Sequence, residues 1–335
     1  MSKTVEEIAK ATGFSVTTVR LIINGQADKY RISARTRQIV EEYVATHGYA
    51  PAPVVRNPRP GGVGGVGIVA PDLADPSVAR LMLALEALCE ERDLALLACA
   101  TRDDRVRESR GVTGLLACGV DGLVIAPSQA EPLAQLRSNK TRARTVLFER
   151  AYPAWPFPAV LGDDRLGGEE IGRKILEASG GDCYFLCGGA EALNMQDRVE
   201  GFVAACEEQG VAEVGGRTWR DAENSVTAGR RLMKMLIDEL RTVPPAFICS
   251  SPQVLEGALL QLREQMGGVD PAVLIGVFGE HALLDFLPNR IASIRQDARA
   301  IAARIFARLT APRDLANPAP PRELIPARLV CRGFP

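Results

Sequence analysis

The chain has 335 residues, of which 47% are hydrophobic, and this is enough to build the cores of two or three domains. Its net charge at pH 7 is −1, and no uninterrupted apolar segment is long enough to span a membrane. The first ten residues, MSKTVEEIAK, lack the apolar core of a secretion signal. These features exclude an integral membrane protein, and we expect a soluble cytoplasmic one. The eight cysteines form no C-x-x-C pair and neither histidine lies at a ligand spacing from them, so we expect no metal site.

The charge is unevenly distributed along the chain. The first 60 residues contain nine Lys and Arg against five Asp and Glu, so the remainder carries a net negative charge. A basic N-terminal segment favours contact with a polyanion, although such a segment is often only a solvated surface.

The first 50 residues predict three short helices. Thr4, Ser15 and Ser33 are suitable N-cap residues, and each precedes an apolar stripe. The three stripes comprise Val5, Ile8 and Ala9, then Val19, Ile22 and Ile23, then Ile39, Val40, Tyr43 and Val44. Gly13 can adopt the positive φ of a tight turn between the first two helices. This spacing and the basic charge favour a DNA-binding helix-turn-helix over an ordinary helical hairpin.

The segment RNPRPGGVGGVGIVAP, residues 56–71, contains the outline of a dinucleotide-binding loop, because Gly62, Gly64 and Gly67 match G-x-G-x-x-G. That loop requires a strand before the glycines and a helix after them. Here prolines precede the glycines, and the apolar run 66–70 is itself the strand. We therefore interpret the segment as a linker between two unlike regions.

From residue 66 onward, short apolar runs alternate with segments of helical periodicity. The predicted strands are 66–70, 94–99, 122–126, 145–148, 183–187, 246–249, 272–277 and 291–294, and the predicted helices include 78–89, 166–176 and 298–309. This alternation predicts two doubly wound α/β subdomains with a ligand crevice at the carboxyl ends of their strands. We place a helix-turn-helix domain in residues 1–51, a hinge in 52–65, one subdomain in 66–158 and 291–320, and the other in 159–290 and 321–335.

The sequence resembles the LacI/GalR repressors. The segment TVEEIAKATGFSVTTVRLIINGQADKYRISARTRQIVEEYVATHGYAP is similar to their DNA-binding head, and residues 4–333 follow their plan of helix-turn-helix, hinge and periplasmic-binding-protein-like core. The segments IINGQADKYRIS, VAPDLADPS and FGEHALLDFL are most similar to the fructose-responsive branch of this family. The resemblance implies a sequence-specific transcriptional regulator that is not an enzyme and that forms a homodimer, with pairing into tetramers left open.

The resemblance also implies which residues contact operator DNA. Phosphate contacts fall on Thr4, Ser15, Thr18, Asn24, Ser33 and Thr36, and base contacts on Val16, Thr17, Arg20 and Leu21. In the hinge, Val54, Val55 and Arg56 would contact the minor groove, and Pro58 takes the position of a leucine that wedges between base steps in relatives. Because proline terminates a helix, we expect a shortened hinge helix and weak coupling between effector and DNA.

The implied effector site lies in the core. Its residues are Asp75, Ser77, Glu149, Arg150, Asp164, Arg198, Ser250 and Glu280. Arginines bind phosphate oxygens and carboxylates accept hydrogen bonds from hydroxyl groups, so the set suits a sugar phosphate, and fructose 1-phosphate is the expected effector. Each residue also has an ordinary structural explanation, such as ion pairing or helix capping. Two other functions stay open, namely a sugar-binding protein without DNA activity and a nucleotide-dependent enzyme.

Overall fold

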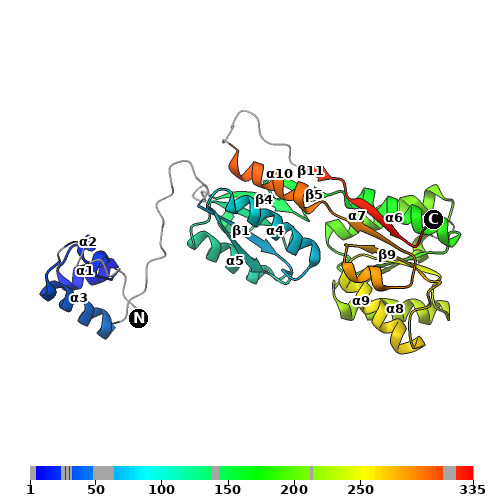
Figure 1. Cartoon of the computed structure of the whole chain (residues 1–335), viewed down its shortest axis with the longest axis horizontal. Coiled ribbons are helices and arrows are strands. Elements are labelled where there is room, and N and C mark those ends of the chain that lie inside the picture. The colour runs from blue at the N-terminus through cyan, green and yellow to red at the C-terminus, as the bar shows by residue number, and fades with distance from the viewer. Residues whose placement is uncertain are drawn as a thin grey trace. The chain divides into compact units, whose positions relative to one another are not determined.

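Three short helices, α1 (Val5–Thr12), α2 (Val16–Ile23) and α3 (Ala34–His47), make up the described part of the N-terminal unit (Figure 1). The computed structural model describes residues 5–23, 27, 30, 32–47, 64–136, 143–211, 214–311 and 322–334. The predicted contacts at Thr4, Asn24, Val54, Val55, Arg56 and Pro58 lie outside these residues. No helix in the described part of the chain is both long and apolar enough to cross a membrane.

Local hydrogen bonds explain where two of these helices begin. The backbone N–H of Thr18 donates to Ser15 Oγ at 3.1 Å, and the backbone N–H of Thr36 donates to Ser33 Oγ at 3.1 Å. Gly13 adopts a φ of +74° in the turn between α1 and α2. The apolar stripes pack together around the buried side chains of Ile8, Val19, Ile22 and Val40. The predicted helix-turn-helix arrangement is confirmed.

The rest of the chain forms two subdomains, each built on a six-stranded sheet. In the first, the sheet order is β11-β5-β4-β3-β1-β2 and all neighbouring strands are parallel. Its strands are β1 (Gly65–Ala70), β2 (Ala95–Ala100), β3 (Gly122–Ile125), β4 (Arg144–Phe148), β5 (Ala159–Gly162) and β11 (Arg322–Ile325). Its helices are α4 (Pro76–Glu90), α5 (Arg105–Ala117) and α10 (Ala298–Thr310), with a short 3₁₀ turn at Ala134–Leu136.

The second subdomain repeats this architecture with the order β12-β10-β9-β8-β6-β7, and only β12 is antiparallel to its neighbour. Its strands are β6 (Tyr184–Cys187), β7 (Thr218–Arg220), β8 (Ala246–Cys249), β9 (Leu274–Phe278), β10 (Ile291–Arg295) and β12 (Arg328–Arg332). Its helices are α6 (Asp164–Ser179), α7 (Leu193–Glu208), α8 (Val226–Leu240) and α9 (Pro252–Met266), with 3₁₀ turns at Val214–Arg217 and Ala282–Phe286. The predicted fold class is confirmed.

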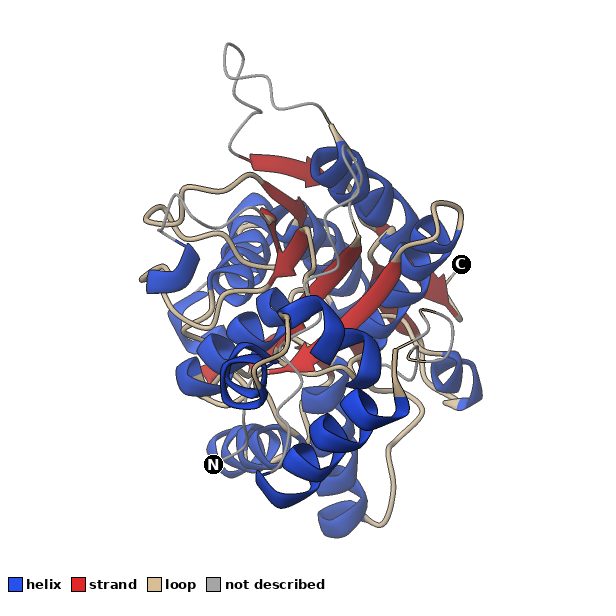
Figure 2. Ribbon diagram, turned by 90° about the vertical axis from the view of Figure 1, so that its left-hand side faces the viewer, coloured by secondary structure: helices blue, strands red, loops and turns tan. Residues whose placement is uncertain are grey.

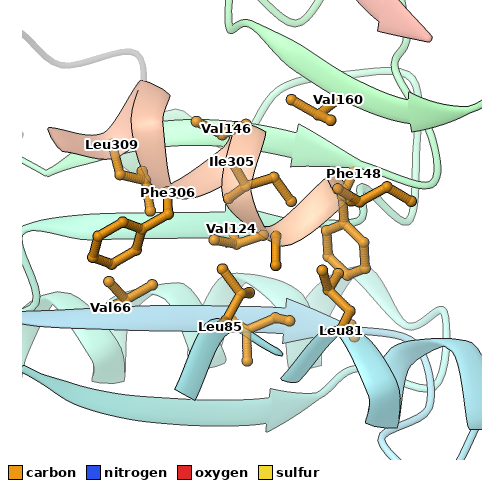
Figure 3. Close-up of a cluster of buried hydrophobic side chains, with 14 of the residues drawn as sticks. Val66, Leu81, Leu85, Val124, Val146, Phe148, Val160, Ile305, Phe306 and Leu309 are labelled. Carbon is orange, nitrogen blue, oxygen red and sulfur yellow. The ribbon is translucent and has the colours of Figure 1, made fainter. Parts of the chain in front are cut away.

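Helices cover both faces of each sheet (Figure 2). In the first subdomain, α4 contributes Leu81 and Leu85 and α10 contributes Ile305 to a core that packs on Val124 and Phe148 of the sheet (Figure 3). Helices α6 and α7 cover one face of the second sheet, and α8 and α9 cover the other (Figure 1). Burial on both faces explains why the central strands read as continuous apolar runs.

The chain crosses between the two sheets three times, and this corrects the predicted subdomain boundaries. We assigned residues 159–162 and 322–325 to the second subdomain, but β5 and β11 pair with each other in the first sheet. We assigned 291–294 to the first, but β10 pairs with β9 and β12 in the second sheet. Apolar periodicity predicts that a strand exists, but only hydrogen-bonded pairing decides which sheet it joins.

Paired glycines let the helices of the second subdomain approach closely. A Cβ atom at Gly201 of α7 would lie 2.8 Å from the Cα of Gly168 in α6. In the same way, a Cβ at Gly257 of α9 would lie 2.8 Å from the Cα of Gly229 in α8. Both helix pairs therefore cross with their backbones in contact, and no side chain can move aside to make room.

We expect Gly201→Ala to lower the free energy of unfolding by about 2–3 kcal/mol, because the added methyl group overlaps the backbone of α6. Gly114→Ala is the matched control, since Gly114 lies in α5 with open space around it. The control should raise stability by about 0.5–1 kcal/mol through helix propensity. Urea denaturation of both variants measures the difference, and equal effects would contradict the close helix crossing.

Candidate functional site

A cleft of about 1100 Å³ lies between the two subdomains. Its walls come from the loops that follow β1, β2, β3 and β4 in the first sheet and β6, β7, β8 and β9 in the second. Charged and amide-bearing side chains on these walls include Asp75, Arg80, Arg102, Asp103, Gln129, Glu149, Arg150, Asn194, Arg198, Glu223, Asn224, Gln253, Glu280 and Gln296. All eight loops lie at the carboxyl ends of strands, which is where open α/β sheets bind ligands.

Six of the eight residues predicted for the effector site line this cleft, namely Asp75, Ser77, Glu149, Arg150, Arg198 and Glu280. The other two, Asp164 and Ser250, are buried beside Arg198 and do not line it. Their interactions with Arg198 orient its guanidinium group.

Arg198 is a buried cation on the wall formed by the second subdomain. Its Nε donates to Asp164 Oδ1 at 2.8 Å and its Nη1 donates to the backbone oxygen of Ser250 at 2.6 Å. The guanidinium group also lies over the ring of Phe278, 4.7 Å from the centroid. Burial raises the pKa of Asp164, and the neighbouring Arg198 opposes that rise. The pair holds a positive charge in a fixed orientation at the cleft.

Arg150 is the corresponding cation on the opposite wall, and Asp103 binds it with both oxygens. Arg150 Nη1 donates to Asp103 Oδ1 at 2.6 Å, and Nη2 donates to Oδ2 at 3.2 Å. The Arg150 side chain is 10% exposed, whereas that of Asp103 is 47% exposed. Arg150 Nε is buried without a hydrogen-bond partner among the described residues. Arg150 is thus buried in the wall of the cleft, and its partner Asp103 is partly exposed to solvent.

Glu149 has an unusual backbone conformation and an altered acidity. Its φ is +57°, and the backbone N–H of Arg150 donates across it to the oxygen of Phe148 at 2.6 Å, which closes a γ-turn. Burial and the nearby carboxylate of Asp75 raise the pKa of Glu149 to about 7, although Arg150 and Arg198 oppose the rise. Near neutral pH this side chain can therefore either donate or accept a hydrogen bond.

Two hydrogen bonds bridge the cleft. Gln253 Nε2, at the start of α9, donates to Asp75 Oδ2 at 3.0 Å, while Asp75 Oδ1 caps α4. Arg80 of α4 donates through Nη2 to the backbone oxygen of Glu280. The Glu280 carboxylate pairs with Arg332 and accepts from Ser293 Oγ at 2.5 Å. The two subdomains are thereby held together across the site.

The amino terminus of α7 opens on the same cleft. Its N-cap residue, Ala192, provides no side-chain hydrogen bond. Asn194, in the first turn, is 5% exposed, and its Oδ1 is buried without a partner among the described residues. Gln253 Oε1 is likewise buried and unpartnered. Unsatisfied polar atoms in a cavity wall are costly unless a polar ligand or water binds them, so this cleft is suited to a polyhydroxylated or anionic molecule.

Sequence reasoning missed Asp103, Asn194 and Gln253. Asp103 lies just beyond a predicted strand, and the rule that ligands bind at the carboxyl ends of strands could have identified it. Asn194 and Gln253 begin helices that follow strands, and the same rule applies to them. The choice among the polar residues in each loop depends on the tertiary structure.

The outward face of α2 carries the residues predicted to contact DNA bases. Val16, Thr17 and Arg20 are exposed and Leu21 is half-buried, whereas Val19 and Ile22 face the core of the N-terminal unit. Four of the six predicted phosphate contacts lie among the described residues, and these four form two similar pairs at helix starts. Ser15 Oγ lies 2.8 Å from Thr18 Oγ1, and Ser33 Oγ lies 2.8 Å from Thr36 Oγ1. Paired hydroxyls at helix amino termini are suited to phosphate oxygens.

Comparison with known proteins identifies the family. The family described as periplasmic binding proteins and sugar binding domain of LacI family matches residues 64–273, and the family of bacterial regulatory proteins, lacI family, matches residues 4–52. The chain belongs to the LacI family. This confirms the resemblance of the N-terminal unit and of the core.

Named relatives place the chain near regulators of sugar operons. It is 30% identical to the fructose operon regulatory protein of Vibrio cholerae, over 89% of this chain and 90% of that protein. It is 27% identical to the sucrose operon repressor of Klebsiella pneumoniae, over 98% of each. The crystal structure of the Cra transcriptional dual regulator from Pseudomonas putida in complex with fructose 1-phosphate has a TM-score of 0.69 and 25% identity, covering 80% of this chain and 98% of that one.

Glu149 should make stability depend on pH. Its pKa rises from an ordinary 4.5 to about 7 on folding, so the folded state binds an extra proton between these values and stability falls as pH rises through them. Glu149→Gln removes this effect. Relative to the wild type, the variant should therefore gain about 3 kcal/mol in free energy of unfolding between pH 4.5 and pH 8.

Urea denaturation at the two pH values tests this expectation. Glu256→Gln, an exposed position on α9, is the matched control for loss of a carboxylate. A pH-independent difference between Glu149→Gln and the wild type would show that the Glu149 carboxyl titrates normally.

Proposed function

We propose that this LacI-family protein is an operator-binding transcriptional regulator, most simply a repressor, that a sugar phosphate releases from DNA. The observation that carries the proposal is the pair of buried arginines, Arg150 and Arg198, on opposite walls of a cleft rich in hydrogen-bonding groups. The exposed face of α2 and its capped amino terminus support the DNA-binding half of the proposal.

Fructose 1-phosphate is the effector that we propose. The Pseudomonas putida relative was crystallised with this molecule, and the Vibrio cholerae relative is named for the fructose operon. In this chain, Arg198, Arg150 and the open amino terminus of α7 supply positive charge for the phosphate. Asp75, Glu149 and Glu280 supply acceptors for sugar hydroxyls.

We further propose that the protein acts as a cytoplasmic homodimer and has no catalytic activity. A single helix-turn-helix reads one half-site, and two-fold symmetric pairing doubles the contact with a palindromic operator. The two alternatives, a sugar-binding protein without DNA activity and a nucleotide-dependent enzyme, leave α2 and its capped amino terminus without a role.

Arg20 should read a base. We expect Arg20→Ala to weaken binding to an operator selected from a random duplex pool by about 1–3 kcal/mol, and to relax base preference at one position in each half-site. Arg37→Ala is the matched control, because Arg37 is an exposed α3 residue whose Nε contacts Glu41 at 2.7 Å. Fluorescence anisotropy titrations measure the operator affinity of both variants. Equal binding of the wild type to selected and random duplexes would refute the DNA-binding function.

Arg198 should bind the phosphate of the effector. We expect calorimetry to detect fructose 1-phosphate but little fructose, and Arg198→Ala to lose about 3 kcal/mol or more of binding free energy. Arg173→Ala, which removes an exposed α6 arginine paired with Glu208 at 2.9 Å, should bind as the wild type does. Saturable binding of fructose alone would point to an unphosphorylated effector. Full affinity in Arg198→Ala would remove this residue from the site.

A further inference from the structure

We infer that Asp103 is an internal competitor for the effector's phosphate, and that its pairing with Arg150 sets how strongly, and how selectively, the cleft binds anions. This inference rests on the proposed function, since it concerns the same cleft. The Asp103 carboxylate occupies both terminal nitrogens of Arg150, at 2.6 and 3.2 Å. Because Arg150 Nε is buried, a ligand phosphate in the cleft reaches the guanidinium group through these two nitrogens and competes there with Asp103.

Exposure indicates which partner is released. Asp103 is 47% exposed, so its carboxylate can leave Arg150 and enter water at small cost. Arg150 is 10% exposed and cannot leave the wall, and without an anion its buried charge would lose its compensation. An incoming phosphate replaces Asp103 as the counter-ion, and the buried cation stays paired throughout.

The loop that carries Asp103 holds a strained backbone conformation. The backbone N–H of Asp104 donates to the oxygen of Thr101 at 3.0 Å, which closes a tight turn after β2. Both central residues of this turn have positive φ, 53° for Arg102 and 55° for Asp103. Neither is glycine, so the backbone holds a conformation that L-residues rarely adopt. The pairing with Arg150 is one of the contacts that hold Asp103 in this conformation.

Replacement of Asp103 by a ligand anion at Arg150 makes the cleft selective for phosphorylated sugars. A neutral sugar offers no negative charge to replace Asp103, so Arg150 stays paired and contributes little to its binding. A phosphorylated sugar brings a charge of nearly −2, which competes with the single charge of the carboxylate. The Asp103–Arg150 pair therefore lowers affinity for all anions and admits only those that bind Arg150 more strongly than a carboxylate does.

Asp103→Asn tests the inference, because competition and positioning of Arg150 predict opposite changes in phosphate affinity. We expect the variant to bind fructose 1-phosphate and inorganic phosphate about tenfold more tightly than the wild type, with fructose binding unchanged. Asp103→Glu keeps the carboxylate and should remain close to the wild type. If Asp103 instead positions Arg150 for the ligand, Asp103→Asn will weaken binding of both phosphates, and that result would overturn the inference.

Two controls separate pairing from general electrostatics. Asp182→Asn breaks a similar pair, in which Asp182 lies 2.7 Å from Arg217 and is 49% exposed. This pair does not line the cleft, so the variant should leave the affinities for fructose 1-phosphate and inorganic phosphate unchanged. Glu191→Gln removes a cleft-lining carboxylate from the opposite wall and should change both affinities much less than Asp103→Asn does.

A double variant tests whether the effect of Asp103 depends on Arg150. In an Arg150→Gln background, Asp103→Asn should give no gain in phosphate affinity, and an undiminished gain there would refute competition at Arg150.

Inorganic phosphate distinguishes failure of this inference from failure of the proposed effector. If neither the wild type nor Asp103→Asn binds fructose 1-phosphate, the proposed effector is wrong. The phosphate titration then still decides the role of Asp103, because comparison with the Arg150→Gln background isolates the part of the phosphate affinity that depends on Arg150. Tighter phosphate binding in Asp103→Asn would uphold the inference, and unchanged or weaker binding would reject it.

Discussion

The packing of the three crossover segments between the sheets is the constraint on which the site depends. The backbone N–H of Asp163, in the first crossover, donates to the oxygen of Ile325 in the third at 3.0 Å. Gln296, in the second, packs so closely on Gly162 that a Cβ there would lie 2.7 Å from its Nε2. These contacts tie the two sheets together at the base of the cleft. Because the binding loops all follow strands, they converge only while the crossovers hold the strand ends facing each other.

The cleft concentrates charge that is costly to bury, and its two buried arginines each have a carboxylate partner. Arg198 is paired with Asp164 inside one wall, and Glu280 is paired with Arg332 at another point of the rim. Arg150 differs, because its partner is half in solvent. A buried ion pair adds little net stability, since desolvation offsets the attraction between the charges. The arrangement is therefore better explained by ligand binding than by folding, and the least buried partner is the one that a ligand can replace.

Much of the fold could be predicted, because it depends on short-range patterns. The caps at Ser15 and Ser33 lie directly before apolar stripes, and the central strands are buried on both faces. Four strands were missed, namely β5, β7, β11 and β12. Strands β11 and β12 contain only exposed and half-buried residues, and β7 has only three residues, so none of the three stands out as an apolar run. Strand β5 is fully buried, but its four residues were not predicted to form a strand.

The sequence by itself determined the helix starts, the alternation of strands and helices, and a set of polar residues at strand ends, because each of these depends on neighbours a few positions apart. The tertiary structure decided which of those residues meet. Asp103 and Arg150 are 47 positions apart, and Asp75 and Gln253 are 178 apart and lie in different subdomains. No local pattern encodes such pairs. They form because parallel strands bring the carboxyl ends of distant segments to one edge, and because the crossovers turn the two edges toward a common cleft.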